Sequence, residues 1–182
     1  MAVTVRDNNK KIKSTFLHIP KNAGSSIRDW MMKNVKHSVD ERPGPHRTRK
    51  ELESSLGNLG VTFCVVRNPY HRAVSAYLYK IKKVGNSFKE KYPTFESYIL
   101  NTKDKVIIEQ HQYFNNCDFI LKFENLIEEF AKIQQLYNCY IPLPHSNKTK
   151  NNDWKSYYTE SAKEKVELIF KNDLKILGYE YR

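Results

Sequence analysis

The stretch that decides the fold is residues 15–27, which read Thr15-Phe-Leu-His-Ile-Pro-Lys-Asn-Ala-Gly-Ser-Ser-Ile27. Its first residues are apolar and typical of a short strand, and Pro20 ends that strand. A helix is expected next, because apolar residues recur at helical spacing from Ile27 onward and Ser25 or Ser26 can cap the first turn. The stretch therefore predicts a strand, a tight turn and a helix.

The turn between this strand and this helix has the residues of an anion-binding loop. Gly24 permits a close approach of a ligand to the backbone, and Lys21 adds a full positive charge. The first N–H groups of a helix have no partner within it, and the helix dipole is positive at that end. We therefore expect a phosphate against residues 22–26, although an ordinary turn with a solvated lysine would show the same residues.

The order and spacing of residues 18–26 resemble the 5′-phosphosulfate loop of sulfotransferases that use 3′-phosphoadenosine 5′-phosphosulfate (PAPS) as donor. Those enzymes carry His-Ile-Pro-Lys-Thr-(Ala/Gly)-Gly-(Thr/Ser)-Ser, and this chain departs from that pattern at Asn22, which replaces Thr. The substitution removes a hydroxyl group and keeps the backbone N–H. The resemblance implies PAPS as cofactor, a catalytic Lys21, and a set of donor-binding residues: Lys21, Asn22, Ala23, Gly24, Ser25 and Ser26.

A second motif, residues 65–77, resembles the 3′-phosphate motif of the same enzymes, Val-Arg-Asn-Pro-Tyr-(Asp/Glu)-Arg-x-x-Ser-x-Tyr. An arginine at the end of a strand can bind a phosphate with two parallel hydrogen bonds, and a serine two helical turns later can add another. The resemblance assigns Arg67 and Ser75 to this phosphate, although each residue alone would be interpreted as an ordinary surface residue. His71 occupies the position where the family prefers an acid.

The resemblance extends to the end of the chain. Residues 123–126 are similar to a Phe-Glu-Asp/Asn-Leu motif, and residues 142–148 are similar to a cofactor loop, which adds Asn147 and Lys148 to the donor-binding set. The motifs look like those of the carbohydrate sulfotransferases, which include heparan 2-O- and chondroitin-type enzymes, rather than those of the cytosolic aryl type.

The predicted strands alternate with helices, which indicates an α/β fold with three layers. Strands are expected at residues 16–19, 61–66 and 119–123, in a central parallel sheet flanked by helices, as in the P-loop NTPases. Ligands of such sheets bind beyond the carboxyl ends of the strands, where the Lys21 loop and Arg67 are placed. We expect one sulfotransferase domain over residues 1–182, with residues 1–13 as a flexible tail.

Three further segments carry local predictions. Residues 37–50 are rich in Pro, Gly and basic residues and are expected to form a loop. Residues 126–137 are expected to form one helix that buries Ile127. The last helix is expected to begin with a capping box formed by Ser161 and Glu164.

Composition limits the classes of partner. The net charge of +11 and the pI near 9.5 favour anionic ligands, such as a polyphosphorylated cofactor, an acidic glycan or a nucleic acid. The three cysteines include no CxxC pair and suggest neither disulfides nor zinc. No apolar stretch reaches the length of a membrane span or a signal peptide, so we expect a cytoplasmic protein, or a Golgi lumen protein if an anchor has been removed.

Two other functions compete with sulfuryl transfer. A P-loop kinase or NTPase also uses a strand, a loop, a lysine and a helix, but Lys21 precedes Gly24 and the GxxxxGK[ST] motif is absent. A basic nucleic-acid-binding module is disfavoured because most aromatic residues lie at core spacing. We expect no metal, no nucleic acid and no membrane span, and a hydroxylated acceptor that is a glycan or a small glycoside.

An acceptor hydroxyl group needs a base, and histidine titrates near neutrality. Among the six histidines, His46 lies in a Pro-Gly-Pro-His loop, where related glycan sulfotransferases often place their catalytic histidine. A solvated histidine in a basic loop is the competing interpretation, and Glu124 is the alternative base. The residues expected to contact an acidic acceptor are Arg42, Arg47, Arg49 and Glu124.

Overall fold

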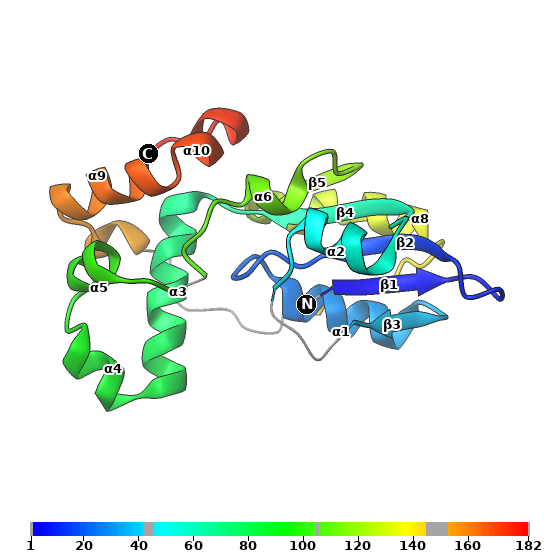
Figure 1. Cartoon of the computed structure of the whole chain (residues 1–182), viewed down its shortest axis with the longest axis horizontal. Coiled ribbons are helices and arrows are strands. Elements are labelled where there is room, and N and C mark those ends of the chain that lie inside the picture. The colour runs from blue at the N-terminus through cyan, green and yellow to red at the C-terminus, as the bar shows by residue number, and fades with distance from the viewer. Residues whose placement is uncertain (1, 42–45, 105, 145–152, 182) are drawn as a thin grey trace. The chain divides into compact units, whose positions relative to one another are not determined.

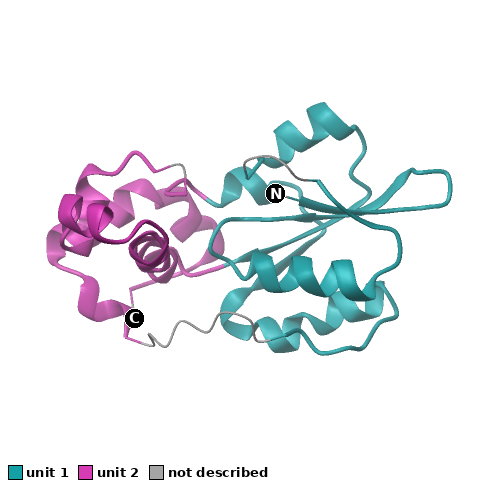
Figure 2. Cartoon of the chain, turned by 90° about the horizontal axis from the view of Figure 1, so that it is seen from below, with its two compact units in different colours: residues 1–66, 110–148 teal, residues 67–109, 149–182 magenta. Residues whose placement is uncertain are grey.

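A computed structural model of the chain describes residues 2–41, 46–104, 106–144 and 153–181 (Figure 1). The chain forms two compact units, each assembled from two separate segments (Figure 2). The first, called the sheet unit, contains residues 1–66 and 110–148. The second, called the helical unit, contains residues 67–109 and 149–182.

The sheet unit is built on a five-stranded sheet in the order β3-β1-β2-β4-β5. The strands are β1 (Ala2–Arg6), β2 (Ile12–Leu17), β3 (Ser38–Asp40), β4 (Val61–Val66) and β5 (Phe119–Lys122). Strands β2, β4 and β5 run parallel, as predicted, whereas β1 pairs antiparallel with both β2 and β3. The sheet is therefore mixed, and the prediction of an all-parallel sheet is wrong at its β1–β3 edge.

Strand β1 also corrects the prediction that residues 1–13 form a flexible tail. Ala2 and Val3 are each 1% exposed, and β1 lies between β2 and β3 in the sheet. The charged and polar residues 7–11 form the connection between β1 and β2. There the Asp7 carboxylate accepts hydrogen bonds from the N–H groups of Asn9 and Lys11.

Helices cover both faces of this sheet (Figure 2). One face packs against α1 (Gly24–Asn34), α7 (Leu126–Glu129) and α8 (Ala131–Leu136) through a core that includes Phe16, Trp30, Phe63, Leu121 and Phe130. The other face carries α2 (Arg49–Leu56) and α6 (His111–Phe114). Successive strand residues point to opposite faces, so Phe63 joins the first core while the Thr62 hydroxyl accepts a hydrogen bond from Arg49 of α2.

Two local predictions in the sheet unit are wrong. Strand β3 lies within residues 37–50, which were expected to form a loop. The expected helix over residues 126–137 is divided at Phe130 into α7 and α8, after a short 3₁₀ helix, η1 (Phe123–Asn125). Leu126 is the buried residue of α7, and Ile127 is 70% exposed rather than buried.

The helical unit packs α3 (Pro69–Val84), α5 (Phe95–Asn101) and α9 (Glu160–Ile169) around an aromatic core that includes Tyr70, Tyr77, Tyr98 and Phe170. It also contains α4 (Asn86–Lys91), the 3₁₀ helix η2 (Trp154–Tyr157) and α10 (Lys171–Leu177). Helix α9 is capped by Thr159, whose hydroxyl accepts a hydrogen bond from the N–H of Ala162. The predicted cap at Ser161 is therefore wrong by two residues.

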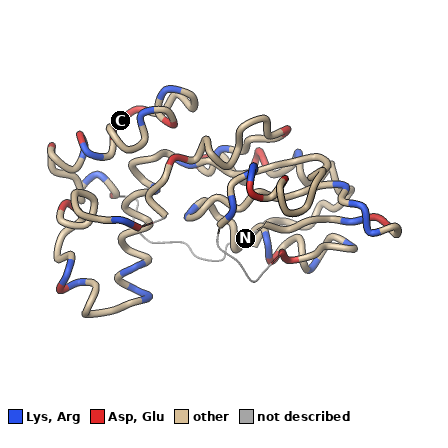
Figure 3. Tube along the Cα trace, in the orientation of Figure 1, with Lys and Arg blue, Asp and Glu red and all other residues tan. Residues whose placement is uncertain are grey.

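Lys and Arg residues are distributed along helices and loops of both units rather than gathered on one element (Figure 3). Within the described ranges, no helix combines the length and the apolar character that crossing a membrane would require.

Candidate functional site

The loop between β2 and α1 has an unusual backbone. Lys21 and Ala23 have φ angles of 71° and 59°, in the left-handed region that non-glycine residues seldom adopt. Ala23 is followed by Gly24, the first residue of the right-handed helix α1. A left-handed residue next to a right-handed one turns successive backbone N–H groups toward one concave side, which is an anion-binding arrangement.

Helix α1 begins without a side-chain cap. Its N-cap is Ala23, and the first backbone bond of the helix runs from the Ile27 N–H to the Ala23 carbonyl at 3.2 Å. The predicted cap is therefore wrong, because Ser25 and Ser26 are the second and third residues of the helix. The first turn contains no acidic residue, so its N–H groups and the positive end of its dipole meet no carboxylate within the turn.

Gly24 is required by packing against His18 rather than by its own φ angle. A Cβ atom at residue 24 would lie 1.9 Å from Cδ2 and Nε2 of the His18 ring. His18 is 5% exposed, and burial, followed by the proximity of His46, lowers its pKa well below 6.5. The group that lies close to Gly24 is thus the buried, neutral imidazole of His18, whereas the sequence predicted a ligand there.

The Asn22 side chain fastens this loop to the rest of the sheet unit. It is 1% exposed, and its Nδ2 donates to the Val65 carbonyl at 2.7 Å and to Gln110 Oε1 at 2.6 Å. The Asn22 side-chain amide therefore bonds within the protein and has a structural role. Gln110, which is fully buried, accepts this bond from Asn22, and the sequence motifs did not indicate it.

His46 lies beside the same loop. Its Nδ1 is 3.2 Å from the carbonyl oxygen of His18, and the two rings meet edge to face with centroids 4.7 Å apart. A carbonyl oxygen can only accept, so Nδ1 carries the proton and the lone pair of the neutral ring is on Nε2. The structure thus brings His46 to the end of β2, next to the predicted phosphate loop.

The other residues that were predicted to contact the acceptor substrate lie in different surroundings. Arg47 donates to the Ser55 hydroxyl at 2.9 Å, and Arg49 forms an ion pair with Glu53 at 2.7 Å and bonds to Thr62, which gives Arg49 a structural role between α2 and β4. Glu124 is exposed in η1. Three predicted site residues lie outside the described residues: Arg42, Asn147 and Lys148.

Arg67 directly follows Val66, the last residue of β4, and begins the helical unit. It is 4% exposed, and its Nη2 lies 2.6 Å from Nε2 of His71 in the first turn of α3. Ser75 is 8% exposed, two turns along the same helix. Of the predicted 3′-phosphate pair, Arg67 therefore lies just before α3, and Ser75 lies in the first half of that helix. Both residues belong to the helical unit.

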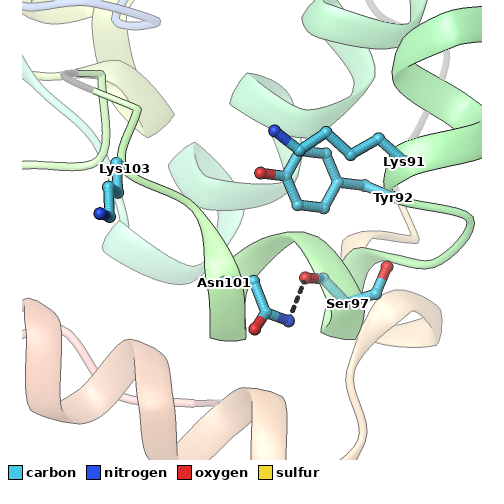
Figure 4. A pocket seen from close by; sticks show the side chains of 5 residues that line it. All are labelled: Lys91, Tyr92, Ser97, Asn101 and Lys103. Atoms are coloured by element: carbon cyan, nitrogen blue, oxygen red, sulfur yellow. Dashed lines mark hydrogen bonds between the residues drawn. The ribbon is translucent and has the colours of Figure 1, made fainter.

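A pocket of about 490 Å³ in the helical unit lies apart from these motifs in the sequence (Figure 4). Its lining residues are Lys91, Tyr92, Ser97, Asn101 and Lys103. The Asn101 amide donates to the Ser97 carbonyl, and the Ser97 hydroxyl donates to the Thr94 carbonyl, so the polar groups of this wall are used within α5 and its cap. None of the predicted site residues lines this pocket.

A model of the sulfotransferase family matches residues 7–180, which includes nearly all of both units. The chain belongs to the sulfotransferase family. No curated protein matches it. The match confirms the family that the two motifs predicted and establishes sulfuryl transfer as the general class of reaction.

In this sulfotransferase, the strands that precede the two motifs are neighbours. Strands β2 and β4 are parallel, and Leu17 at the end of β2 is paired with Cys64, two residues before the end of β4. The Lys21 loop and the end of β4, which Arg67 directly follows in the sequence, therefore lie at the same edge of the sheet. The carboxyl edge of parallel strands is where α/β proteins bind their ligands.

Proposed function

We propose that this sulfotransferase transfers the sulfuryl group of PAPS to a hydroxyl group of a carbohydrate acceptor. The observation that carries the proposal is the loop before α1, where left-handed Lys21 and Ala23 lead into an uncapped helix start without acids. This arrangement fits a 5′-phosphosulfate. The parallel β2-β4-β5 core with helices on both faces is consistent with a P-loop-like fold, which forms part of the proposal.

Two groups of residues would hold the donor. Backbone N–H groups of residues 22–26 and the Lys21 ammonium would bind the 5′-phosphosulfate, and Arg67 and Ser75 would bind the 3′-phosphate. When bound, PAPS supplies an activated sulfuryl group. Lys21 would stabilise the negative charge that develops on the departing phosphate oxygen, so its contribution would be largest in the transition state.

His46 would act as the general base. Its tautomer leaves the Nε2 lone pair to take the proton of the acceptor hydroxyl as that oxygen bonds to sulfur and the bond from sulfur to the 5′-phosphate breaks. The products are the sulfated acceptor and 3′-phosphoadenosine 5′-phosphate (PAP). The net charge of +11 favours an acidic glycan as the acceptor, and Arg47 would be one of its contacts.

Donor identity can be tested by binding. The protein should be retained on immobilised 3′,5′-ADP and released by PAP but not by ATP, because only PAP has the 3′-phosphate that Arg67 and Ser75 are proposed to hold. Equal release by ATP would favour a nucleotide-binding function of the P-loop NTPase type. Failure to bind the resin under any condition would contradict the donor site.

A further inference from the structure

The Arg67 and His71 side chains are joined by a short hydrogen bond, with 2.6 Å between Nη2 and Nε2. A guanidinium group can only donate, so Nε2 of His71 is the acceptor and the ring proton lies on Nδ1. Arg67 precedes α3 and His71 is the third residue of that helix, so the bond joins the end of the strand segment to the first helical turn.

The surroundings of His71 fix the direction of its ring. Asn68 caps α3 by accepting hydrogen bonds from the N–H groups of Tyr70 and His71, at 2.9 and 3.5 Å, and Pro69 is the first helical residue. The Trp154 ring stacks on the imidazole, with an interplanar angle of 18° and 6.1 Å between centroids. The acceptor nitrogen is therefore held in place before any ligand arrives.

The charge of the pair follows from the same arrangement. Burial, together with the nearby Arg67 charge, lowers the pKa of His71 to about 4, so its ring is neutral at neutral pH. The pair therefore keeps the full positive charge of Arg67. An acid at position 71, which the resembling motif prefers, would also orient Arg67 but would offset its charge as an ion pair.

We propose that His71 is a positioning residue that orients the Arg67 guanidinium for the 3′-phosphate of the donor without neutralising it. This inference rests on the proposed function, since it takes Arg67 as the phosphate ligand. A long arginine side chain loses conformational freedom when it binds a ligand, and a hydrogen bond formed in advance reduces that loss. A neutral acceptor provides this orientation while it preserves the attraction between Arg67 and a phosphate.

The test is the dissociation constant of PAP, measured by titration calorimetry on the full chain. His71→Leu removes the acceptor, whereas His71→Gln keeps an acceptor oxygen at about the reach of Nε2. We expect His71→Leu to weaken PAP binding about 5- to 10-fold and His71→Gln to stay within about twofold of the wild type. The control His37→Asn changes an exposed histidine with a φ of 59°, which asparagine tolerates, and should leave the affinity unchanged.

Combination with Arg67→Ala separates this inference from the function on which it rests. Arg67→Ala should weaken PAP binding more than His71→Leu, and His71→Leu should have no further effect in the Arg67→Ala background. If Arg67→Ala weakens binding while His71→Leu does not, or if the two effects add, the positioning role is refuted and the donor site stands. If Arg67→Ala itself leaves PAP affinity unchanged, the assignment of Arg67 to the 3′-phosphate fails.

Thermal unfolding of each variant checks that the variant is folded. If His71→Leu does not fold, His71→Phe replaces it in the same measurements.

Discussion

Nδ1 of His46 lies 3.2 Å from the carbonyl oxygen of His18, so a backbone acceptor at the end of β2 determines which nitrogen of His46 has the lone pair. This relationship joins a residue of the basic loop to the segment that leads into the phosphate loop. It gives His46 the tautomer that a general base requires.

We predict that His46→Ala lowers kcat by about 10²- to 10⁴-fold and leaves the PAP dissociation constant within about twofold of the wild type. The increase of kcat toward alkaline pH should disappear as well, because the base is gone. Steady-state kinetics across pH, together with PAP calorimetry, measure both effects. Near-full turnover of His46→Ala would transfer the role to Glu124 or another histidine.

Lys21→Ala and Arg67→Ala should both lose activity, but in different parameters. Lys21 is proposed to act on charge that develops during the reaction, so Lys21→Ala should mainly lower kcat. Arg67 is proposed to hold a phosphate that does not react, so Arg67→Ala should mainly raise the KM for PAPS. Kinetics at varied PAPS concentration distinguish the two, and a Lys21→Ala variant with normal kcat would contradict the assignment of that lysine.

Asn22→Ala should destabilise the protein, because the Val65 carbonyl and Gln110 Oε1 would lose their buried donor. We expect a loss of about 2 kcal/mol in the free energy of unfolding, together with weaker PAP binding as the left-handed residues on either side relax. Urea denaturation and calorimetry measure these effects. Asn101→Ala removes an exposed amide in α5 and is the matched control, with an expected change of at most about 0.5 kcal/mol. Equal stability of the two variants would mean that Asn22 does not fasten the loop.

Gly24→Ala should be strongly destabilising, because the added methyl group would overlap the His18 ring, whose Nε2 lies 1.9 Å from the Cβ position. The combination of Gly24→Ala with His18→Ala should cost less than the sum of the two single substitutions, since removal of the ring makes room. Thermal unfolding of the two single variants and the double variant completes this cycle. Strict additivity would show that the glycine is not required by His18.

Much of the fold follows from local pattern. The apolar, β-branched run at residues 61–66 predicted β4 with the bounds that the structure has. The apolar face of α1 was predicted equally well, and Ile27, Trp30 and Met31 are buried. Strands β1 and β3 were missed because each acquires its order from its neighbours in the sheet, a condition that local sequence does not contain.

The site was predicted as residue types and spacings, but not as a backbone conformation. Nothing in the letters of Lys21 or Ala23 indicates a left-handed φ. That conformation accompanies the bonds of Asn22 to Val65 and Gln110, which lie 43 and 88 residues away in sequence. The hydrogen bond between Arg67 and His71 could have been suspected from their four-residue spacing, but its direction required the structure.

The central claim, sulfuryl transfer from PAPS to a hydroxyl acceptor, is tested most directly by transfer of ³⁵S from labelled PAPS. The purified protein would be incubated with labelled PAPS and a panel of acidic glycans, neutral glycans and small alcohols, and the products resolved by mass. We predict label in at least one glycan, formed together with stoichiometric PAP and absent with Lys21→Ala. A protein that binds PAP yet labels no hydroxyl compound in the panel, carbohydrate or otherwise, would contradict the account.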